Sequence, residues 1–142
     1  MNKKGFTLLE LLIALAVVGI LATLGFSSFL GAQRRAQLSE ATAQFASDLQ
    51  RARSEAQRHN RNASLALNDD SSYILTLDGN ATIRTLPHGA QVEVVSGADT
   101  VTYNAPYGEV DAPDRRFAIS SARIDEVRYV RIIGVTGKVI NQ

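Results

Sequence analysis

Glu10 has the most unusual chemical setting of any residue in this sequence. It is the only charged side chain between Lys4 and Arg34, in a stretch that is otherwise largely apolar. An ionised carboxylate inside a membrane-spanning segment costs about 2.5 to 3.5 kcal/mol even on lenient insertion scales, so such residues are usually functional and paired. The position of Glu10 therefore predicts a specific partner for its carboxylate.

The other residues suited to catalysis or metal binding form no recognised arrangement. His59 and His88 have no serine or acid at a spacing that suggests a catalytic triad, and we interpret both as surface or turn residues. Four acids in the C-terminal half are candidates for calcium but match no calcium-loop spacing: Asp111, Asp114, Asp125 and Glu126. The chain has no cysteine and no phosphate-binding glycine motif. We expect no enzyme activity, no metal and no cofactor.

Length and composition predict one compact domain preceded by a distinct N-terminal segment. The chain has 142 residues, of which 45% are hydrophobic and 20% are charged. Its 15 Lys and Arg residues nearly balance its 14 Asp and Glu residues, which leaves a net charge of +1. Overall charge therefore favours neither a nucleic-acid partner nor a disordered acidic tail.

Residues 6–30 form an apolar segment of 25 residues that contains one charge. As a helix it would reach about 37 Å, more than the roughly 30 Å hydrocarbon core of a bilayer. Lys3 and Lys4 before it predict a cytoplasmic N-terminus, with the rest of the chain across the membrane. A signal peptide cut after the weak A-x-A match at residues 14–16 would leave a second apolar stretch at the new N-terminus. A plain signal anchor explains the apolar residues but not Glu10.

The helix is expected to continue through residues 31–62, because no proline occurs before Pro87 and good helix formers predominate. Apolar residues three or four positions apart predict one buried stripe: Leu38, Ala41, Phe45, Leu49, Ala52 and Ala56. We interpret the charges of this segment, including the acids Glu40, Asp48 and Glu55, as a solvated helix face. Glu55 stands one turn before Arg58, and the helix is expected to end near Asn60 or Asn62.

From residue 63 to residue 142 the pattern alternates, which predicts β-strands. The expected strands are residues 64–67, 73–77, 81–86, 91–95, 100–104, 116–120, 127–133 and 138–141. Hairpin turns are expected at residues 78–80 and 135–137, where glycine supplies a positive φ. A helix followed by a run of strands indicates an α+β fold in which an antiparallel sheet covers the helix stripe.

The sequence K-G-F-T-L-L-E at residues 4–10, followed at once by the apolar run, resembles the class III leader of type IV prepilins and type II secretion pseudopilins. The resemblance implies that residues 1–5 are a leader that a prepilin peptidase removes by cutting between Gly5 and Phe6. It also implies N-methylation of Phe6. In such filaments the Glu10 carboxylate is thought to meet the Phe6 amine of a neighbouring subunit, which would offset its desolvation.

Three further segments are similar to the GspH/FimT family of minor pilins and pseudopilins. They are L-x-x-A-R-S-E-A at residues 49–56, a P-x-G turn at residues 103–108 and a G-[RK]-V hairpin at residues 137–139. The resemblance implies the pilin fold and a structural subunit of a type IV pilus or a type II secretion pseudopilus. Such a subunit is a single-pass inner-membrane protein with a periplasmic C-terminal domain before it joins other pilins in a filament. Residue 27 is a serine where major pilins often have proline, which favours a minor subunit.

DNA binding during competence is the alternative function, because some FimT-like minor pilins take up DNA through basic residues near the C-terminal hairpin. The matching place here carries Lys138, with Arg128 and Arg131 on the preceding strand. This departs from an arginine-rich hairpin. Three cations predict only a weak and salt-sensitive contact with phosphates.

Overall fold

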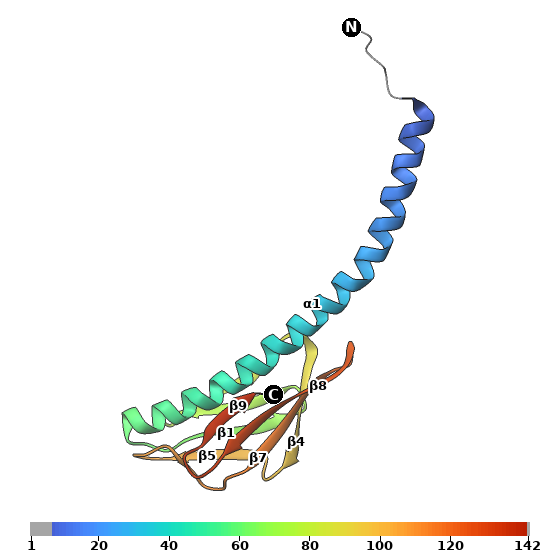
Figure 1. Ribbon diagram of the computed structural model, residues 1–142. Helices are drawn as coiled ribbons and strands as arrows, with labels where there is room; N and C mark the ends of the chain where they lie inside the picture. The colour runs from blue at the N-terminus through green and yellow to red at the C-terminus, as the bar shows by residue number, and fades with distance from the viewer. Residues whose placement is uncertain (1–6, 142) are drawn as a thin grey trace. The chain divides into compact units, whose positions relative to one another are not determined.

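The computed structural model describes residues 7–141, apart from the side chains of residues 24–27. It contains one long helix, α1 (Leu8–His59), followed by strands that pair only in antiparallel fashion (Figure 1). The chain divides into two compact units, up to Arg34 and from Arg35 onward, and α1 contributes to both. The α+β fold class expected from the sequence is confirmed.

The ends of α1 are fixed by local interactions. At its start the Thr7 side-chain oxygen accepts a hydrogen bond of 3.3 Å from the backbone N–H of Glu10, which is the bond that an N-cap residue makes. At its end Asn60 adopts a left-handed conformation with φ 51°, a common helix terminator. The helix therefore ends where the sequence predicts.

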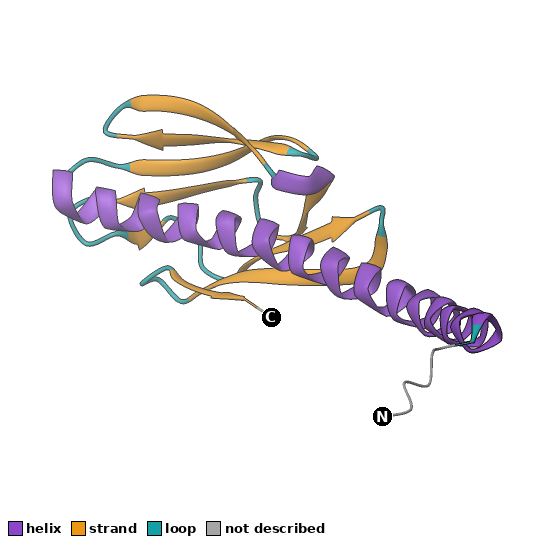
Figure 2. Cartoon of the chain, turned by 90° about the horizontal axis from the view of Figure 1, so that it is seen from above, coloured by secondary structure: helices purple, strands orange, loops and turns teal. Residues whose placement is uncertain are grey.

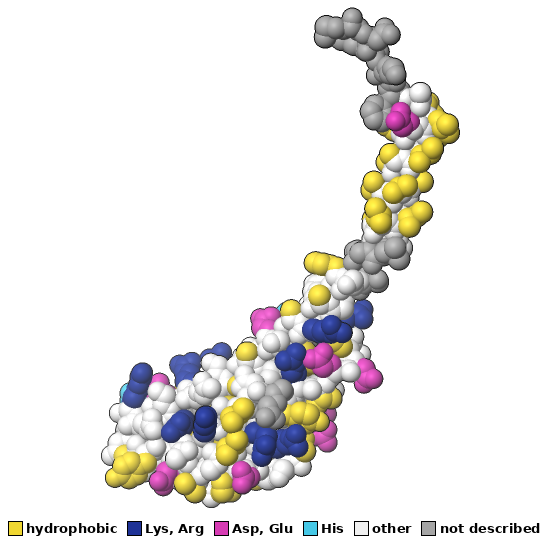
Figure 3. All heavy atoms as spheres, in the orientation of Figure 1, with side chains coloured by type: hydrophobic (Ala, Val, Ile, Leu, Met, Phe, Trp, Pro, Cys, Tyr) yellow, Lys and Arg dark blue, Asp and Glu magenta, His cyan; other side chains and the backbone are white. Residues whose placement is uncertain are grey.

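The N-terminal unit exposes its apolar side chains. An 18-residue window of α1 has a mean hydropathy of 2.5, and none of that window is buried within the chain. Leu8, at the first position of α1, is 78% exposed. Hydrophobic side chains cover much of the visible face of this part of the helix (Figure 3). A helix of this length and composition is sufficient to span a bilayer.

The strands of the C-terminal unit form two sheets. The first has the order β3-β2-β1-β5-β6, with β1 (Ala63–Asp69), β2 (Ser72–Leu77), β3 (Asn80–Thr85), β5 (Thr100–Asn104) and β6 (Glu109–Val110). The second has the order β4-β7-β8-β9, with β4 (Ala90–Ser96), β7 (Arg115–Ser121), β8 (Ile124–Ile133) and β9 (Lys138–Asn141). A short 3-10 turn, η1 (Pro87–Gly89), joins β3 to β4.

All eight predicted strands are present, with boundaries shifted by up to three residues. Two features differ from the expectation: the strands divide between two sheets instead of one, and β6 was not predicted because two residues carry no periodicity. The turn at Asp78 and Gly79 is a two-residue hairpin, as expected, with φ values of 50° and 81°.

The second half of α1 supplies the centre of the core (Figure 2). All six residues of the predicted stripe are buried, each at most 1% exposed. The Phe45 ring makes edge contacts with Tyr73 on β2, at 5.2 Å, and with Phe117 on β7, at 5.3 Å. Phe45 therefore ties the helix to both sheets at once.

One expectation about the charged face of α1 was wrong: Asp48 is buried. Asp48 is only 8% exposed, and its carboxylate accepts a hydrogen bond of 2.6 Å from the hydroxyl of buried Tyr73. Burial and this carboxylate raise the pKa of Tyr73. Glu55 pairs with His59 at 3.0 Å, one turn along the helix, and no described contact joins it to Arg58.

Candidate functional site

The first candidate site is the start of α1. Glu10 is exposed on the first helical turn, where the helix dipole favours a negative charge. The apolar side chains around it are also exposed. The predicted cleavage and methylation positions, Gly5 and Phe6, lie outside the described residues. The Glu10 carboxylate therefore lies on an exposed apolar stretch of helix. No contact among the described residues gives it a partner within the chain.

The second candidate site lies in the C-terminal unit, where the three family-like segments meet. The Gln57 side-chain amide on α1 donates a hydrogen bond of 2.8 Å to the backbone oxygen of Tyr107, within the P-x-G turn. The backbone N–H of Val110 donates to the oxygen of Val135 at 3.0 Å, which links β6 to the turn between β8 and β9. The end of α1, the P-x-G turn and the β8–β9 turn, which are far apart in the sequence, therefore lie next to one another in the structure.

Two glycines allow this close approach. Gly108 has φ 66°, and a Cβ there would lie 3.0 Å from the Arg53 Cγ atom. Gly137 has φ 64°, and a Cβ there would lie 2.7 Å from the Tyr103 ring and 2.9 Å from Val110. Both positions have a left-handed backbone: at Gly137 the ring leaves no room for a side chain, and at Gly108 the Arg53 side chain would have to shift. The glycines of the two motifs thus serve packing as well as turn geometry.

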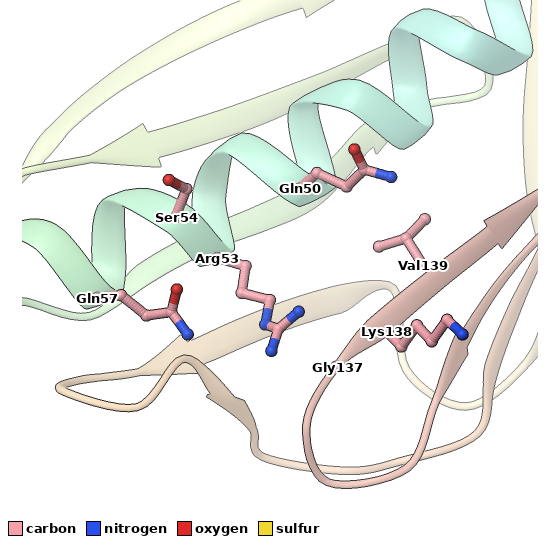
Figure 4. A pocket seen from close by; sticks show the side chains of 7 residues that line it. All are labelled: Gln50, Arg53, Ser54, Gln57, Gly137, Lys138 and Val139. Carbon is pink, nitrogen blue, oxygen red and sulfur yellow. The ribbon is translucent and has the colours of Figure 1, made fainter.

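A cavity of about 280 Å³ lies between α1 and the turn from β8 to β9 (Figure 4). Its lining residues are Gln50, Arg53, Ser54 and Gln57 from the helix, with Gly137, Lys138 and Val139 from the hairpin. Figure 4 shows the Arg53 side chain extending from the helix toward the turn. The Lys138 side chain runs along its own strand, away from Arg53. Among the described residues, no acid lines the cavity.

Buried polar groups lie close to this cavity. Burial raises the pKa of the Tyr103 hydroxyl, and the nearby positive charges of Arg53 and Arg115 partly oppose that rise. Arg115 is 2% exposed, and its Nη2 atom donates to the Asp111 carboxylate at 2.7 Å. Sequence reasoning identified neither Arg53 nor Arg115 as a site residue, because neither belongs to a catalytic spacing. The family-like segment around Arg53 was the available signal.

The three candidate DNA contacts do not share one surface. Val130 and Ile132 are buried, so the alternation of β8 places Arg131 on the opposite, outer face, while Arg128 shares the side of the buried residues. Arg128 is also paired with Glu126 at 2.8 Å. Lys138 lies on the same outer face as Arg131, because its neighbour Val139 pairs with Ile132 and packs on the core. Of the three candidate DNA contacts, Arg131 and Lys138 therefore share the outer face of the sheet, and Arg128 does not.

The outer face of this sheet carries a further arginine that the sequence did not indicate. Arg116 on β7 lies directly opposite Arg131 on β8. Its guanidinium stacks over the Tyr129 ring at 4.3 Å from the ring centre. Only the register between neighbouring strands of this sheet places these residues together, and that register was not predictable from the sequence. Arg116, Arg131 and Lys138 define what we term the cationic face.

The two histidines, and Asp111 and Glu126 among the four C-terminal acids, make separate contacts. His88 in η1 pairs with Glu40 on α1 at 2.9 Å. Glu126 pairs with Arg35 at 3.7 Å as well as with Arg128. Within residues 7–141 no group of three or more His, Asp or Glu side chains is arranged to hold a metal ion. The acids considered for calcium therefore do not gather in the described part of the chain.

Comparison with known proteins identifies the family. Residues 1–26 match the prokaryotic N-terminal methylation motif, which implies processing by a prepilin peptidase. Residues 41–137 match the family model described as type II transport protein GspH. No curated protein sequence matches the chain.

Two solved structures are similar to this one, and both are of the type IV minor pilin FimU from Pseudomonas aeruginosa strain PAO1. One superimposes with a TM-score of 0.63 at 23% identity, covering 77% of this chain and 90% of FimU. The other, from a second crystal form, gives a TM-score of 0.56 at 22% identity, covering 76% and 91%. These similarities show the same fold. Together with the match over residues 41–137, they show that this chain belongs to the GspH family and is a minor pilin or pseudopilin.

Proposed function

We propose that this subunit is inserted in the inner membrane through residues 6–30, cut between Gly5 and Phe6, and N-methylated on Phe6. Its N-terminus lies in the cytoplasm and residues 63–142 form a periplasmic domain, carried by the amphipathic helix segment 31–62. The same apolar helix then packs the subunit among other pilins in a type IV pilus or type II secretion pseudopilus. The observation that carries this proposal is the unburied apolar surface of α1 with one carboxylate on its first turn.

In this proposal the Glu10 carboxylate binds the Phe6 amine of a neighbouring subunit. The bond between Thr7 and the Glu10 backbone gives the carboxylate region a defined helical start, which supports a fixed register. Pairing with an amine would offset the cost of burying the charge in a filament core. The pair also selects one axial stagger between subunits, because a shift along the helix would leave both charges without partners.

The test compares three single variants in cells that assemble the filament. Glu10→Ala and Glu10→Gln should each lower incorporation into filaments about tenfold or more, since a buried charge pair that loses one partner costs roughly 3 to 5 kcal/mol. Thr7→Val removes only the helix-capping oxygen, worth about 1 kcal/mol, and should incorporate far better. Membrane insertion and a mature N-terminus at Phe6, read by N-terminal sequencing, should be unchanged in all three. Normal incorporation of Glu10→Gln would contradict the proposed pair.

The cationic face supports a second candidate function, the binding of DNA. It presents three cations on adjacent strands β7, β8 and β9, and no described ion pair occupies them. Tyr129 adds an aromatic ring beside Arg116. Such a face could hold about three phosphates, which predicts binding that falls steeply as salt rises.

The DNA candidate is tested with the full-length protein in detergent by mobility shift at low and high salt. Arg131→Gln should lower affinity and reduce the salt slope by about one, as expected for the loss of one phosphate contact. Arg128→Gln is the matched control and should change neither, because Arg128 lies off this face in a pair with Glu126. No shift by the wild-type protein at low salt would exclude this function.

A further inference from the structure

The cavity between α1 and the β8–β9 turn is lined by an arginine with one buried donor that has no acceptor among the described residues. The Arg53 Nε atom is buried and has no hydrogen-bond partner among the described residues. No described ion pair involves Arg53 or Lys138, and the lining residues include no acid. The cavity therefore carries the positive charge of Arg53, and its side-chain acceptors are the neutral oxygens of Gln50, Ser54 and Gln57.

Further unpaired polar groups lie in the core on the far side of Gly137, around Tyr103. Gly137 lines the cavity and lies against the Tyr103 ring, whose hydroxyl is buried without a partner among the described residues. Arg115 uses its Nη2 atom for Asp111, but its Nε and Nη1 atoms are buried and unpaired within the same part of the chain. A buried donor left unsatisfied costs about 1 to 3 kcal/mol. The unpaired donor of Arg53 in the cavity lining indicates that the cavity receives an acceptor group.

The dimensions and the rim of the cavity indicate what kind of group enters. Its volume of about 280 Å³ is ample for a carboxylate-bearing side chain, yet it lies below the roughly 300 to 1,000 Å³ of pockets for larger ligands. Two exposed apolar residues lie on turns connected to the lining: Tyr107, 73% exposed, whose backbone oxygen accepts from the lining residue Gln57, and Val135, 59% exposed, two residues before Gly137. Tyrosine and arginine around a small pocket are typical of protein interfaces.

We propose that this cavity binds the carboxylate of an Asp or Glu side chain from a neighbouring pilin subunit, with the Arg53 guanidinium as its principal ligand. A planar guanidinium can donate two parallel hydrogen bonds to one carboxylate, which gives direction as well as affinity. Tyr107 and Val135 would then lie against the neighbour's surface. The identity of the partner rests on the proposed filament role, whereas the carboxylate chemistry does not.

The chemistry is tested on the full-length protein in detergent micelles with ¹⁵N-labelled arginine. Blocked glutamate, N-acetylglutamate amide, should produce a saturable shift of the Arg53 Nε–H resonance, with half-saturation at about 10 mM as expected for one isolated side chain. The neutral probe N-acetylglutamine amide should produce none. Arg53→Gln should abolish the shift, and Arg51→Gln should not, because Arg51 is exposed on the same helix outside the cavity lining. No shift with blocked glutamate would overturn the proposal.

The partner is tested in cells. Arg53→Glu, which would repel an incoming carboxylate, should lower incorporation into filaments at least fivefold, and Arg51→Glu should leave it near the wild-type level. Membrane-inserted protein is measured in each strain to exclude loss by misfolding. If the probe binds but Arg53→Glu incorporates normally, a neighbouring subunit is not the source of the carboxylate. Because the probe titration does not depend on Glu10, a failure of the Glu10 variants to affect assembly would leave the carboxylate site itself standing.

Discussion

Gly137 illustrates how single residues hold the family-like hairpin in place. It combines φ 64° with a close approach of its backbone to the Tyr103 ring. Gly134, three residues earlier in the same turn, has nearly the same φ of 63°, but a Cβ added there would meet nothing within 4 Å among the described residues. Substitutions at the two glycines therefore share the cost of the left-handed backbone, and only the one at Gly137 adds a cost from close packing.

We expect Gly137→Ala to destabilise the fold more than Gly134→Ala. Both substitutions place an L-residue in a left-handed conformation, at about 1 to 2 kcal/mol. Only Gly137→Ala also forces a methyl group into Tyr103 and Val110, which adds roughly 1 to 3 kcal/mol of overpacking. Urea unfolding of both variants beside the wild type measures the difference. Equal losses would show that the Tyr103 contact relaxes at little cost.

At the scale of elements, the buried pair of Asp48 on α1 and Tyr73 on β2 joins the helix to the first sheet. Tyr73 and Tyr103 are both fully buried, but only the Tyr73 hydroxyl has a described acceptor. Tyr73→Phe leaves a buried carboxylate without its donor, so we expect a loss of about 1 to 3 kcal/mol. Tyr103→Phe removes a hydroxyl that has no described partner and should cost less. Thermal unfolding of the two variants gives the comparison, and a Tyr103→Phe loss as large as that of Tyr73→Phe would contradict it.

The elements themselves were largely predictable, because helical and alternating periods are local signals. The six-residue stripe on α1 followed from spacings of three and four. Asp48 occupies the same face, three positions after Phe45, but because it is charged we expected it to be solvent-exposed. The pairing of β1 with β5 and of β4 with β7 was not predictable, since no local pattern specifies which distant strands meet. The cationic face was missed for the same reason.

At the scale of the whole molecule, every core residue of the described chain lies in the unit that begins at Arg35. The first buried residue is Leu38, and most of the apolar side chains described in the N-terminal unit are exposed. We expect a chain that starts at Arg35 to be soluble, and to unfold cooperatively with a midpoint within a few degrees of the full-length protein in detergent. Circular dichroism during heating tests this. A non-cooperative transition would mean that the preceding helix is needed for folding.

The division of the strands between two sheets also determines when the C-terminal unit is able to fold. The chain passes from one sheet to the other three times, from β3 to β4, from β4 to β5 and from β6 to β7. Neither sheet is complete until late in the sequence: the first requires β6 at residue 110, and the second requires β9 at residue 141. Contacts between distant segments make folding slow, so the emerging chain stays open until nearly its last residue has been synthesised.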